Sequence, residues 1–194
     1  MVAVSATFTG DNLDKVKSLI PNAKILVGET QPLVNIKKYI LRTEKAAKQE
    51  NLFSVLKSIG DETTIVFINF RHQGEQMVKD LKKMHGIGAV FIHGEQSQHD
   101  RMKAFEKMRL MKLNLVISTD LLARGVDLPE VRYVINYDMP LTHAEFLHRI
   151  GRSGRFGAEG VAVCFIQETD LAMDYVNEII KEGIPDYNEW QPSS

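Results

Sequence analysis

Two glycines and three arginines alternate in an eight-residue stretch, residues 148–155, which closes an apolar segment with helical spacing. A glycine beside an arginine lets the backbone approach a ligand closely, because no Cβ stands in the way. Each guanidinium group presents a planar fork of N–H donors that suits phosphate oxygens. Arg152 and Arg155 are three residues apart and would share one face of a helical turn. The stretch predicts a phosphate-binding turn, although three arginines alone also fit a solvated basic turn.

A second candidate stretch, residues 118–127, combines an arginine-glycine pair with a carboxylate two residues further on. Gly125 permits unusual backbone angles and exposes N–H groups, which bind phosphate well. Asp127 can accept a hydrogen bond from a ribose hydroxyl. The alternative is a capped turn, in which Arg124 and Asp127 satisfy the local backbone.

A third candidate stretch, residues 93–101, runs from a turn at Gly94 into a predicted helix that begins at Gln98. The first amides of such a helix are expected to be free, and Arg101 lies about one turn inside it. Free amides and a nearby guanidinium group form a phosphate-binding corner. Taken alone, Arg101 also fits a solvated helix residue.

Several motifs of complete nucleotide sites are absent from the sequence. It contains no G-x-x-x-x-G-K-[ST] phosphate loop and no Asp-Glu-Ala-Asp. Without the amides and lysine of such a loop, and without a carboxylate for Mg²⁺, the chain cannot build a phosphoryl-transfer site alone. No Cys/His cluster has zinc spacing, so no metal site is predicted. The chain is therefore expected to carry half of a site.

Apolar, β-branched runs alternate with amphipathic helical segments from residue 36 onward. Strands are expected at 36–41, 63–69, 87–92, 113–118, 131–136 and 160–167, and helices at 44–59, around 77–81, and at 98–110, 142–150 and 169–181. Strands that are apolar on both faces and separated by helices predict a three-layer α/β fold with an open, mostly parallel sheet. Ligands in such folds gather at the carboxyl ends of the strands, where residues 69–71, 93–101 and 119–127 fall.

The composition is that of a soluble globular protein, with 44% hydrophobic and 25% charged residues in 194. The net charge of −1 gives no support for nucleic-acid binding, so any basic footprint must be local. The single cysteine, Cys164, lies in an apolar run and is expected to be buried. One cysteine cannot form an internal disulfide, which favours an intracellular protein, cytoplasmic or nuclear. No apolar stretch is long enough to span a membrane, and no signal peptide is expected.

The octapeptide at 148–155 resembles motif VI of the DEAD-box ATP-dependent RNA helicases, HRIGRxGR, at every specified position. His148 at its head, rather than a glutamine, favours this branch over related helicases. Residues 118–127 resemble motif V, usually TDxxARGxD, and residues 93–101 resemble motif IVa, HGxxxQxxR. The resemblance implies a RecA-like fold.

Two weaker matches extend the resemblance over essentially the whole chain. Residues 65–69 with Arg71 resemble motif IV, but Phe70 stands where the family often has a hydroxyl residue. Its ring could stack on a ligand or pack against the protein, and packing is the expected role. Residues 5–7, Ser-Ala-Thr, resemble motif III, which closes the first of two RecA-like domains. The implied organisation is the end of that first domain at 1–21, a linker at 22–35, the second RecA-like domain at 36–183 and a tail at 184–194.

The resemblance implies that this half completes an ATP site whose Mg²⁺ and phosphates are held mainly by the missing N-terminal domain. Arg152 and Arg155 would be catalytic arginine fingers that also contact ATP, and His148 would help to connect the closed interface. Asp127 would reach the ATP ribose, and Gly125 would lie beside the nucleotide. The fragment alone is expected to be inactive.

The same resemblance implies RNA binding through phosphates and sugars, without base recognition. The residues assigned to this contact are Asn69, Arg71, Gly94, Gln98, Arg101, Thr119, Asp120, Arg124 and Gly125. Expected partners are RNA, the N-terminal RecA-like domain of the same protein and protein regulators, with a monomeric fragment and no membrane. Arg149 is expected to have a structural or bridging role.

Two other functions remain open at this stage. One is a non-catalytic adaptor that uses the same fold to hold RNA or protein, against which the intact pair Arg152 and Arg155 argues. The other is a DNA helicase of the same superfamily, against which His148 argues.

Overall fold

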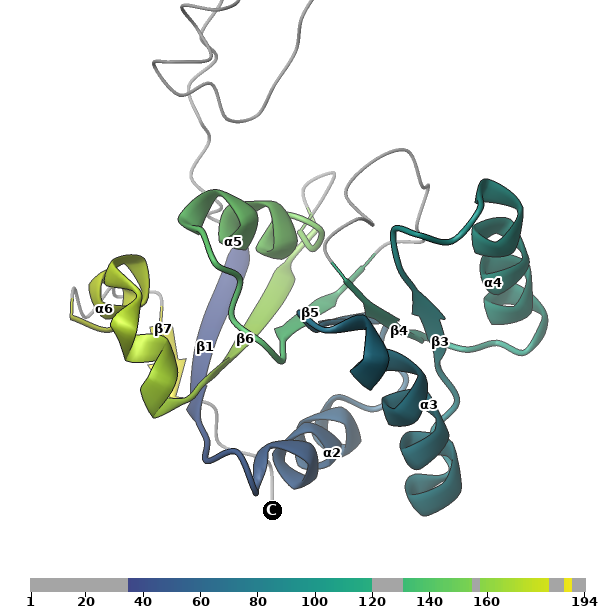
Figure 1. Ribbon diagram of the computed structural model, residues 1–194, viewed down its shortest axis with the longest axis horizontal. Helices are drawn as coiled ribbons and strands as arrows, with labels where there is room; N and C mark the ends of the chain where they lie inside the picture. The colour runs from purple at the N-terminus through teal and green to yellow at the C-terminus, as the bar shows by residue number, and fades with distance from the viewer. Residues whose placement is uncertain (1–34, 120–130, 155–157, 182–186, 190–194) are drawn as a thin grey trace, which may run out of the picture. The chain divides into compact units, whose positions relative to one another are not determined.

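Seven strands form one sheet in the computed structural model, which describes residues 35–119, 131–154, 158–181 and 187–189 (Figure 1). The strands are β1 (Ile36–Arg42), β2 (Thr64–Phe67), β3 (Val90–Ile92), β4 (Leu115–Ser118), β5 (Tyr133–Asn136), β6 (Gly160–Ile166) and β7 (Tyr187–Glu189). Their order is β3-β4-β2-β5-β6-β1-β7, and every pairing is parallel. The predicted open, parallel sheet is confirmed.

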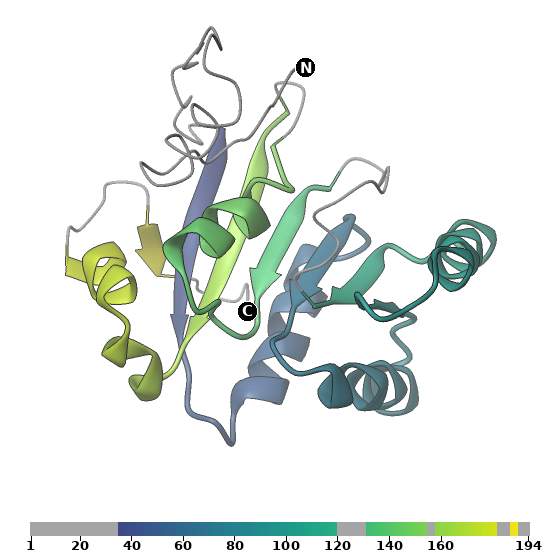
Figure 2. The same cartoon turned by 45° about the horizontal axis from the view of Figure 1, so that its top comes forward.

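Helices cover both faces of the sheet, as a parallel sheet requires. They are α2 (Lys48–Ile59), α3 (Arg71–His85), α4 (Gln98–Leu110), α5 (His143–Ile150) and α6 (Asp174–Lys181), with a short 3₁₀ helix, η3 (Glu168–Ala172). Figures 1 and 2 show α2 and α3 on one side of the sheet and α4 and α5 on the other. The arrangement is the three-layer α/β/α architecture expected from the sequence.

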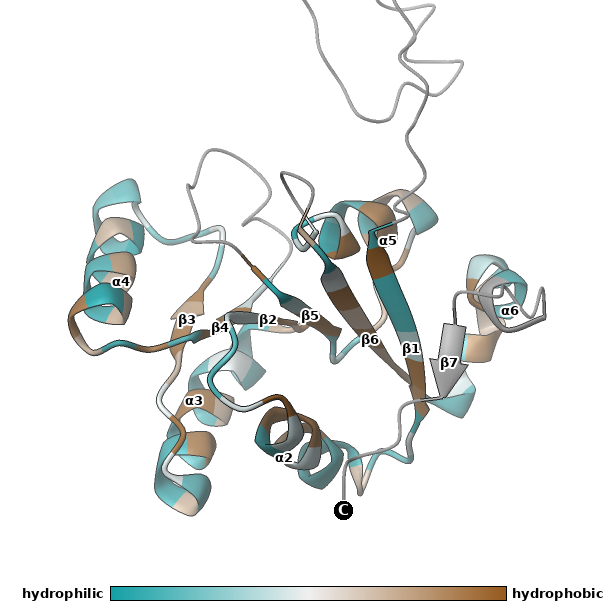
Figure 3. Cartoon of the chain, turned by 180° about the vertical axis from the view of Figure 1, so that it is seen from behind, coloured by the Kyte–Doolittle hydropathy of each residue, from teal (hydrophilic) through white to brown (hydrophobic). Residues whose placement is uncertain are grey.

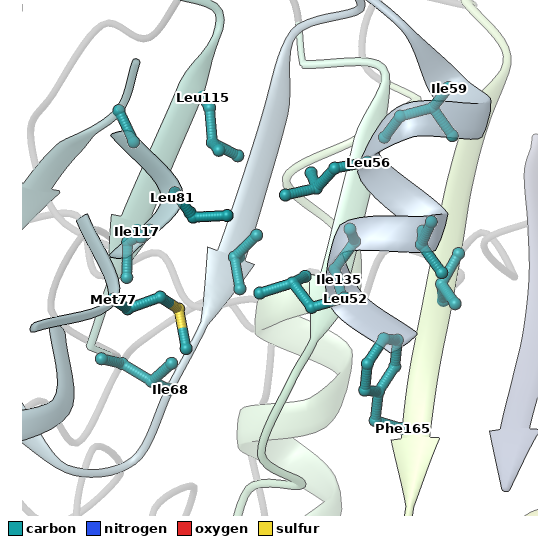
Figure 4. Close-up of a cluster of buried hydrophobic side chains, with 14 of the residues drawn as sticks. Leu52, Leu56, Ile59, Ile68, Met77, Leu81, Leu115, Ile117, Ile135 and Phe165 are labelled. Carbon is teal, nitrogen blue, oxygen red and sulfur yellow. The ribbon is translucent and has the colours of Figure 1, made fainter. Parts of the chain in front are cut away.

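The larger core cluster lies between the sheet and helices α2 and α3 (Figure 4). Leu52 and Leu56 of α2, together with Met77 and Leu81 of α3, pack on apolar side chains of the central strands. The strands contribute Val66, Leu115, Ile117, Ile135, Val161, Val163 and Phe165, and Ile68 joins them from just after β2. Each fully buried Leu, Ile or Phe side chain stabilises the fold by about 1.5–3 kcal/mol relative to leaving it exposed.

A second cluster fills the opposite face under α4, where Met108 packs with Ala104 and Phe105 against strands β2 to β5. All seven residues of β6 are buried, and this strand is hydrophobic over most of its length in Figure 3. Cys164 of β6 is fully buried, as predicted, and burial raises the pKa of its thiol to about 12. The thiol is therefore protonated at neutral pH and behaves as a small core side chain.

Side-chain caps fix the starts of two helices that carry predicted site residues. The hydroxyl oxygen of Ser97 accepts a hydrogen bond from the Asp100 amide at 3.1 Å at the start of α4. The hydroxyl oxygen of Thr142 accepts one from the Glu145 amide at 3.2 Å at the start of α5. Both are the hydroxyl caps that helix N-termini favour.

Candidate functional site

The loops that follow β2, β3 and β4 lie side by side at the carboxyl edge of the sheet, because these strands are neighbours in the order β3-β4-β2. Backbone hydrogen bonds continue past the strands and join the loops. The Ile68 amide donates to the Ser118 carbonyl at 2.9 Å, and the Thr119 amide donates to the Ile92 carbonyl at 3.3 Å. Three of the predicted RNA-binding segments therefore meet at one edge, as the sequence predicted for a parallel sheet.

An ion pair links two of these loops through their side chains. The Arg71 guanidinium, at the start of α3, donates to the Glu95 carboxylate in the turn after β3. Both side chains are exposed, at 52% and 74%. Exposed pairs of this kind are worth only about 0–1 kcal/mol, so a phosphate group can displace the Glu95 carboxylate at little cost.

Arg101 and His93 contain buried nitrogen atoms, Nε of Arg101 and Nδ1 of His93, that have no hydrogen-bond partner in the part of the chain that the structure describes. A buried, unpaired donor on a charged group costs a few kcal/mol. Burial lowers the pKa of His93 below 6.5, the positive charge of Arg71 lowers it further, and Glu95 and Glu75 oppose the shift. The imidazole is therefore neutral at pH 7, and Arg71 and Arg101 are the cationic groups of this corner.

The start of α4 differs from the prediction in one respect. Its first amides were expected to be free for a phosphate, but the Asp100 amide is already bonded to Ser97, so that expectation is wrong at this position. The Asp100 carboxylate also stands in the first turn, where it occupies the favourable end of the helix dipole. Any phosphate contact at α4 must therefore depend more on Arg101 than on this capped amide. Gln98, the first residue of the helix, is exposed.

Asn69 is committed to internal hydrogen bonds. Its side-chain nitrogen donates to the Met139 carbonyl at 2.8 Å, and its side-chain oxygen accepts from the Arg149 guanidinium at 2.8 Å. Its backbone amide donates to the Asp138 carboxylate at 2.9 Å. The RNA contact predicted for Asn69 stays a prediction, and what its side chain does in the structure is to join the ends of β2 and β5.

Arg149 is the centre of this internal contact and is only 3% exposed. Besides Asn69, it donates to the Asp138 carbonyl at 2.6 Å, and its guanidinium carbon lies 5.2 Å from the centre of the Phe67 ring. It holds α5 against the ends of β2 and β5, which agrees with the structural role expected for it.

A buried ion pair between Lys48 and Asp138 joins this network of hydrogen bonds and was not predicted from the sequence. Lys48, at the start of α2, donates to the Asp138 carboxylate at 2.5 Å and to the Gln167 side chain at 3.1 Å. Its ammonium nitrogen also lies 4.5 Å from the centre of the Tyr137 ring. Burial and the neighbouring Asp138 carboxylate raise the pKa of Tyr137 to about 12. One charged cluster thus ties the carboxyl ends of β2, β5 and β6 to helices α2 and α5; we call Lys48, Asn69, Asp138, Arg149 and Gln167 the brace.

The octapeptide begins on α5 and ends at the opposite, amino edge of the sheet. Ser153 forms a parallel bridge with Val131, just before β5, and a Cβ added to Gly154 would stand 3.0 Å from Ile36 at the start of β1. Gly154 has φ +67°, a left-handed conformation that favours glycine. The glycine that follows Arg152 and Ser153 therefore lets the chain turn tightly against the sheet.

Arg152 is half-buried at this amino edge, and its Nε donates to the His148 carbonyl at 3.2 Å, one helical turn back. This bond sets the direction in which the guanidinium leaves the end of α5. His148 is also half-buried. Arg155 lies outside the described residues, as do Asp120, Arg124, Gly125 and Asp127 of the second stretch.

The predicted site residues thus fall into two groups at opposite edges of the sheet. Arg71, Gly94, Arg101 and Thr119 lie at the carboxyl edge, whereas Arg152 lies at the amino edge. Within the described residues, no group of three or more His, Cys, Asp or Glu side chains could hold a metal ion, and no helix is long and apolar enough to cross a membrane.

Comparison with known proteins identifies the fold. Residues 46–157, more than half of the chain, match the family described as the helicase conserved C-terminal domain. The chain belongs to this helicase family. Its similarity to DEAD-box helicases places it as the C-terminal RecA-like domain of that group.

Three individual proteins illustrate the similarity. The ATP-dependent RNA helicase FAL1 of Saccharomyces cerevisiae is 37% identical over 178 residues, which are 89% of this chain and 44% of that protein. The structure of S. cerevisiae Dbp5 bound to RNA and ADP BeF3 superposes with a TM-score of 0.80 at 27% identity, covering 96% of this chain and 50% of that chain.

The third, the E. coli DEAD-box protein SrmB bound to regulator of ribonuclease activity A, has a TM-score of 0.64 at 30% identity over 71% of this chain and 81% of that chain. The chain spans less than half of the length of FAL1.

Proposed function

We propose that this chain is the C-terminal half of a DEAD-box ATP-dependent RNA helicase. In this proposal its carboxyl edge binds the RNA backbone, and its amino edge supplies arginines to an ATP molecule held by an N-terminal RecA-like domain. Residues 1–21 would end that first domain, 22–35 would be the linker, 36–183 the second domain and 184–194 a tail. The observation that carries the RNA assignment is the corner at the carboxyl edge. There Arg71, the first residue of α3, pairs with Glu95 in the turn after β3, and the buried Nε of Arg101 in the first turn of α4 has no partner among the described residues.

The proposed division of labour follows from the position of each group. At the carboxyl edge, Arg71, Gly94, Arg101 and Thr119 would contact phosphates and sugars, which fix the position of an RNA strand without reading its bases. Gln98 and Asn69 would assist there, with Asp120, Arg124 and Gly125 continuing the contact in the following segment. Such binding is independent of sequence, and 2′-hydroxyl contacts would separate RNA from DNA.

At the amino edge, Arg152 and Arg155 would approach the phosphates of ATP, and Asp127 and Gly125 would lie at its ribose. ATP bound with Mg²⁺ supplies the phosphoryl bond, and hydrolysis develops charge that arginine stabilises. The half-buried Arg152 fits this task because its bond to the His148 carbonyl orients the guanidinium before the domains close. The brace supports this position, because it fixes α5 through Arg149.

Protein regulators and an intracellular location, cytoplasmic or nuclear, are part of the same proposal. The structure of SrmB bound to a regulator supports the first, as a property of that relative. The single, buried Cys164 supports the intracellular location, because one cysteine cannot form an internal disulfide that an oxidising compartment would favour.

The 194-residue chain by itself is expected to hydrolyse no ATP above background, even with RNA present. Its sequence has neither the phosphate loop nor the paired carboxylates that position Mg²⁺. Phosphate release from the purified chain, measured with and without single-stranded RNA, checks this expectation. A protein that also carries the N-terminal domain is the positive control, and robust turnover by the 194-residue chain would sink the half-site proposal.

Arg101→Ala is expected to weaken RNA binding and to flatten its dependence on salt. A lost phosphate contact removes about one released counterion, so the slope of log K against log salt should fall by roughly 0.7 for a single strand. Fluorescence anisotropy of a labelled oligouridine over a salt series measures both quantities. Arg109→Ala, in the last turn of the same helix, is the matched control and should change neither. An unchanged slope in Arg101→Ala would count against a phosphate contact.

A further inference from the structure

Phe70 is exposed at the carboxyl edge of the sheet, directly between Asn69 and Arg71. Its side chain is 56% exposed, so the packing role expected from the sequence is wrong. Phe70 is also the N-cap residue of α3, where it makes no side-chain cap. A Ser or Thr at this position would accept a hydrogen bond from a helix amide and stabilise α3 by about 0.5–2 kcal/mol. Phe70 thus provides neither the helix cap that a hydroxyl residue would provide nor the stabilisation of a buried ring. This indicates that its ring contacts another molecule.

The surroundings of Phe70 are those of a shallow binding site. An open hollow of about 600 Å³ on the surface is lined by residues 69–72 and Glu75. The imidazole of His72 lies 5.8 Å from the phenyl ring, centre to centre, with the two planes at 38°. The hollow thus combines an exposed aromatic ring, a second tilted ring and the guanidinium group of Arg71.

We propose that Phe70 stacks on a base of the RNA strand whose phosphates Arg71 and Arg101 bind. This inference rests on the proposed RNA-binding function and adds one contact to it. A single-stranded nucleic acid presents flat bases and phosphates in alternation, and proteins bind it with aromatic rings set among cationic groups. Phe70 and Arg71 are consecutive residues at the start of α3, so an aromatic ring and a cationic group stand next to each other there. Glu75 can accept a hydrogen bond from a ribose hydroxyl or an exocyclic amine.

The geometry favours RNA over an apolar protein partner as the occupant. Among the described residues, the hollow around Phe70 is lined by Asn69, Arg71, His72 and Glu75 and by no second apolar side chain. A protein interface of ordinary size would need a wider apolar centre. A base needs only one ring face, because every base has a π face of its own. Stacking of this kind is largely indifferent to base identity, so it is compatible with sequence-independent binding.

The test compares an oligouridine with an abasic oligomer of the same backbone, binding to the 194-residue chain. Phe70→Ala should weaken the affinity for the oligouridine roughly 5- to 100-fold, the usual range for one base–aromatic stack, and leave the abasic oligomer unaffected. Phe70→Tyr should bind like the original chain. Met84→Ala is the matched control, because Met84 lies on the same helix and is also 56% exposed. Thermal unfolding of each variant checks that the fold is intact.

A tryptophan at position 70 gives an independent reading of stacking. In a Trp190→Phe background, Phe70→Trp carries the only indole in the chain. Its fluorescence should be quenched by the oligouridine and not by the abasic oligomer. Equal loss of affinity for both oligomers in Phe70→Ala, or no loss for either, would overturn the stacking contact while leaving backbone binding in place. Failure of the original chain to bind any RNA would overturn both proposals.

Discussion

Arg155→Ala, in a protein that carries both RecA-like domains, is expected to lower RNA-stimulated kcat by roughly 10³–10⁵-fold. This loss corresponds to about 4–7 kcal/mol of activation free energy. The reason is electrostatic, because an arginine that enters a closed site neutralises charge that develops on the transferred phosphoryl group. Arg152→Ala should also lower the RNA-stimulated kcat, since Arg152 follows α5 and is three residues from Arg155 in the sequence.

Steady-state phosphate release with saturating RNA measures this effect, and RNA affinity measured beside it separates catalysis from binding. Arg132→Ala is a suitable control, because Arg132 is exposed at the same amino edge, next to Val131. It should retain normal turnover. Arg155→Lys should remain close to Arg155→Ala in kcat, because an ammonium group lacks the planar fork of donors. Near-normal turnover by a folded Arg155→Ala variant would refute the assignment.

The fold could be predicted because its strands are short runs of apolar residues in the sequence. Every residue of β2, β4 and β6 is buried, as strands covered by helices on both faces must be. Element ends were less predictable. The helix expected from residue 44 begins at Lys48, because the Thr43 amide still bonds to the Ile166 carbonyl at 3.0 Å, and a turn follows before the helix starts. β7 was missed because three residues near a chain end carry no periodic signal.

Only those parts of the site that consist of residues close together in the sequence could be predicted. The loops after β2, β3 and β4 were expected at one edge because parallel strands all end there. The brace was not, because most of its bonds join residues 69–119 positions apart, such as Arg149 with Asn69 and Lys48 with Gln167. Spacing along the sequence shows no such pairs. The exposure of Phe70 was equally hidden, since an aromatic residue after a buried strand usually packs.

Lys48→Ala is expected to lower the free energy of unfolding by roughly 3–5 kcal/mol, a large part of the stability of an ordinary domain. The side chains of Lys48 and Asp138 are only 8% and 13% exposed. Removing the ammonium group leaves the Asp138 carboxylate buried without its counter-charge, and the Gln167 oxygen loses a donor. A displaced Asp138 carboxylate would also weaken its hydrogen bond with the Asn69 amide. Because Asn69 bonds to Arg149 of α5, the attachment of α5 to the sheet would weaken as well.

Urea unfolding followed by circular dichroism measures this loss as a lower midpoint at an unchanged slope. The exposed pair Lys37–Glu159 supplies the matched control, because its side chains are 60% and 61% exposed. Lys37→Ala should cost no more than about 1 kcal/mol. Adding Asp138→Asn to Lys48→Ala should recover part of the loss, since no buried charge is then left unpaired. If Lys48→Ala and Lys37→Ala were equally stable, the buried pair would contribute no more than a surface one, and α5 would have to be held by Arg149 and apolar packing alone.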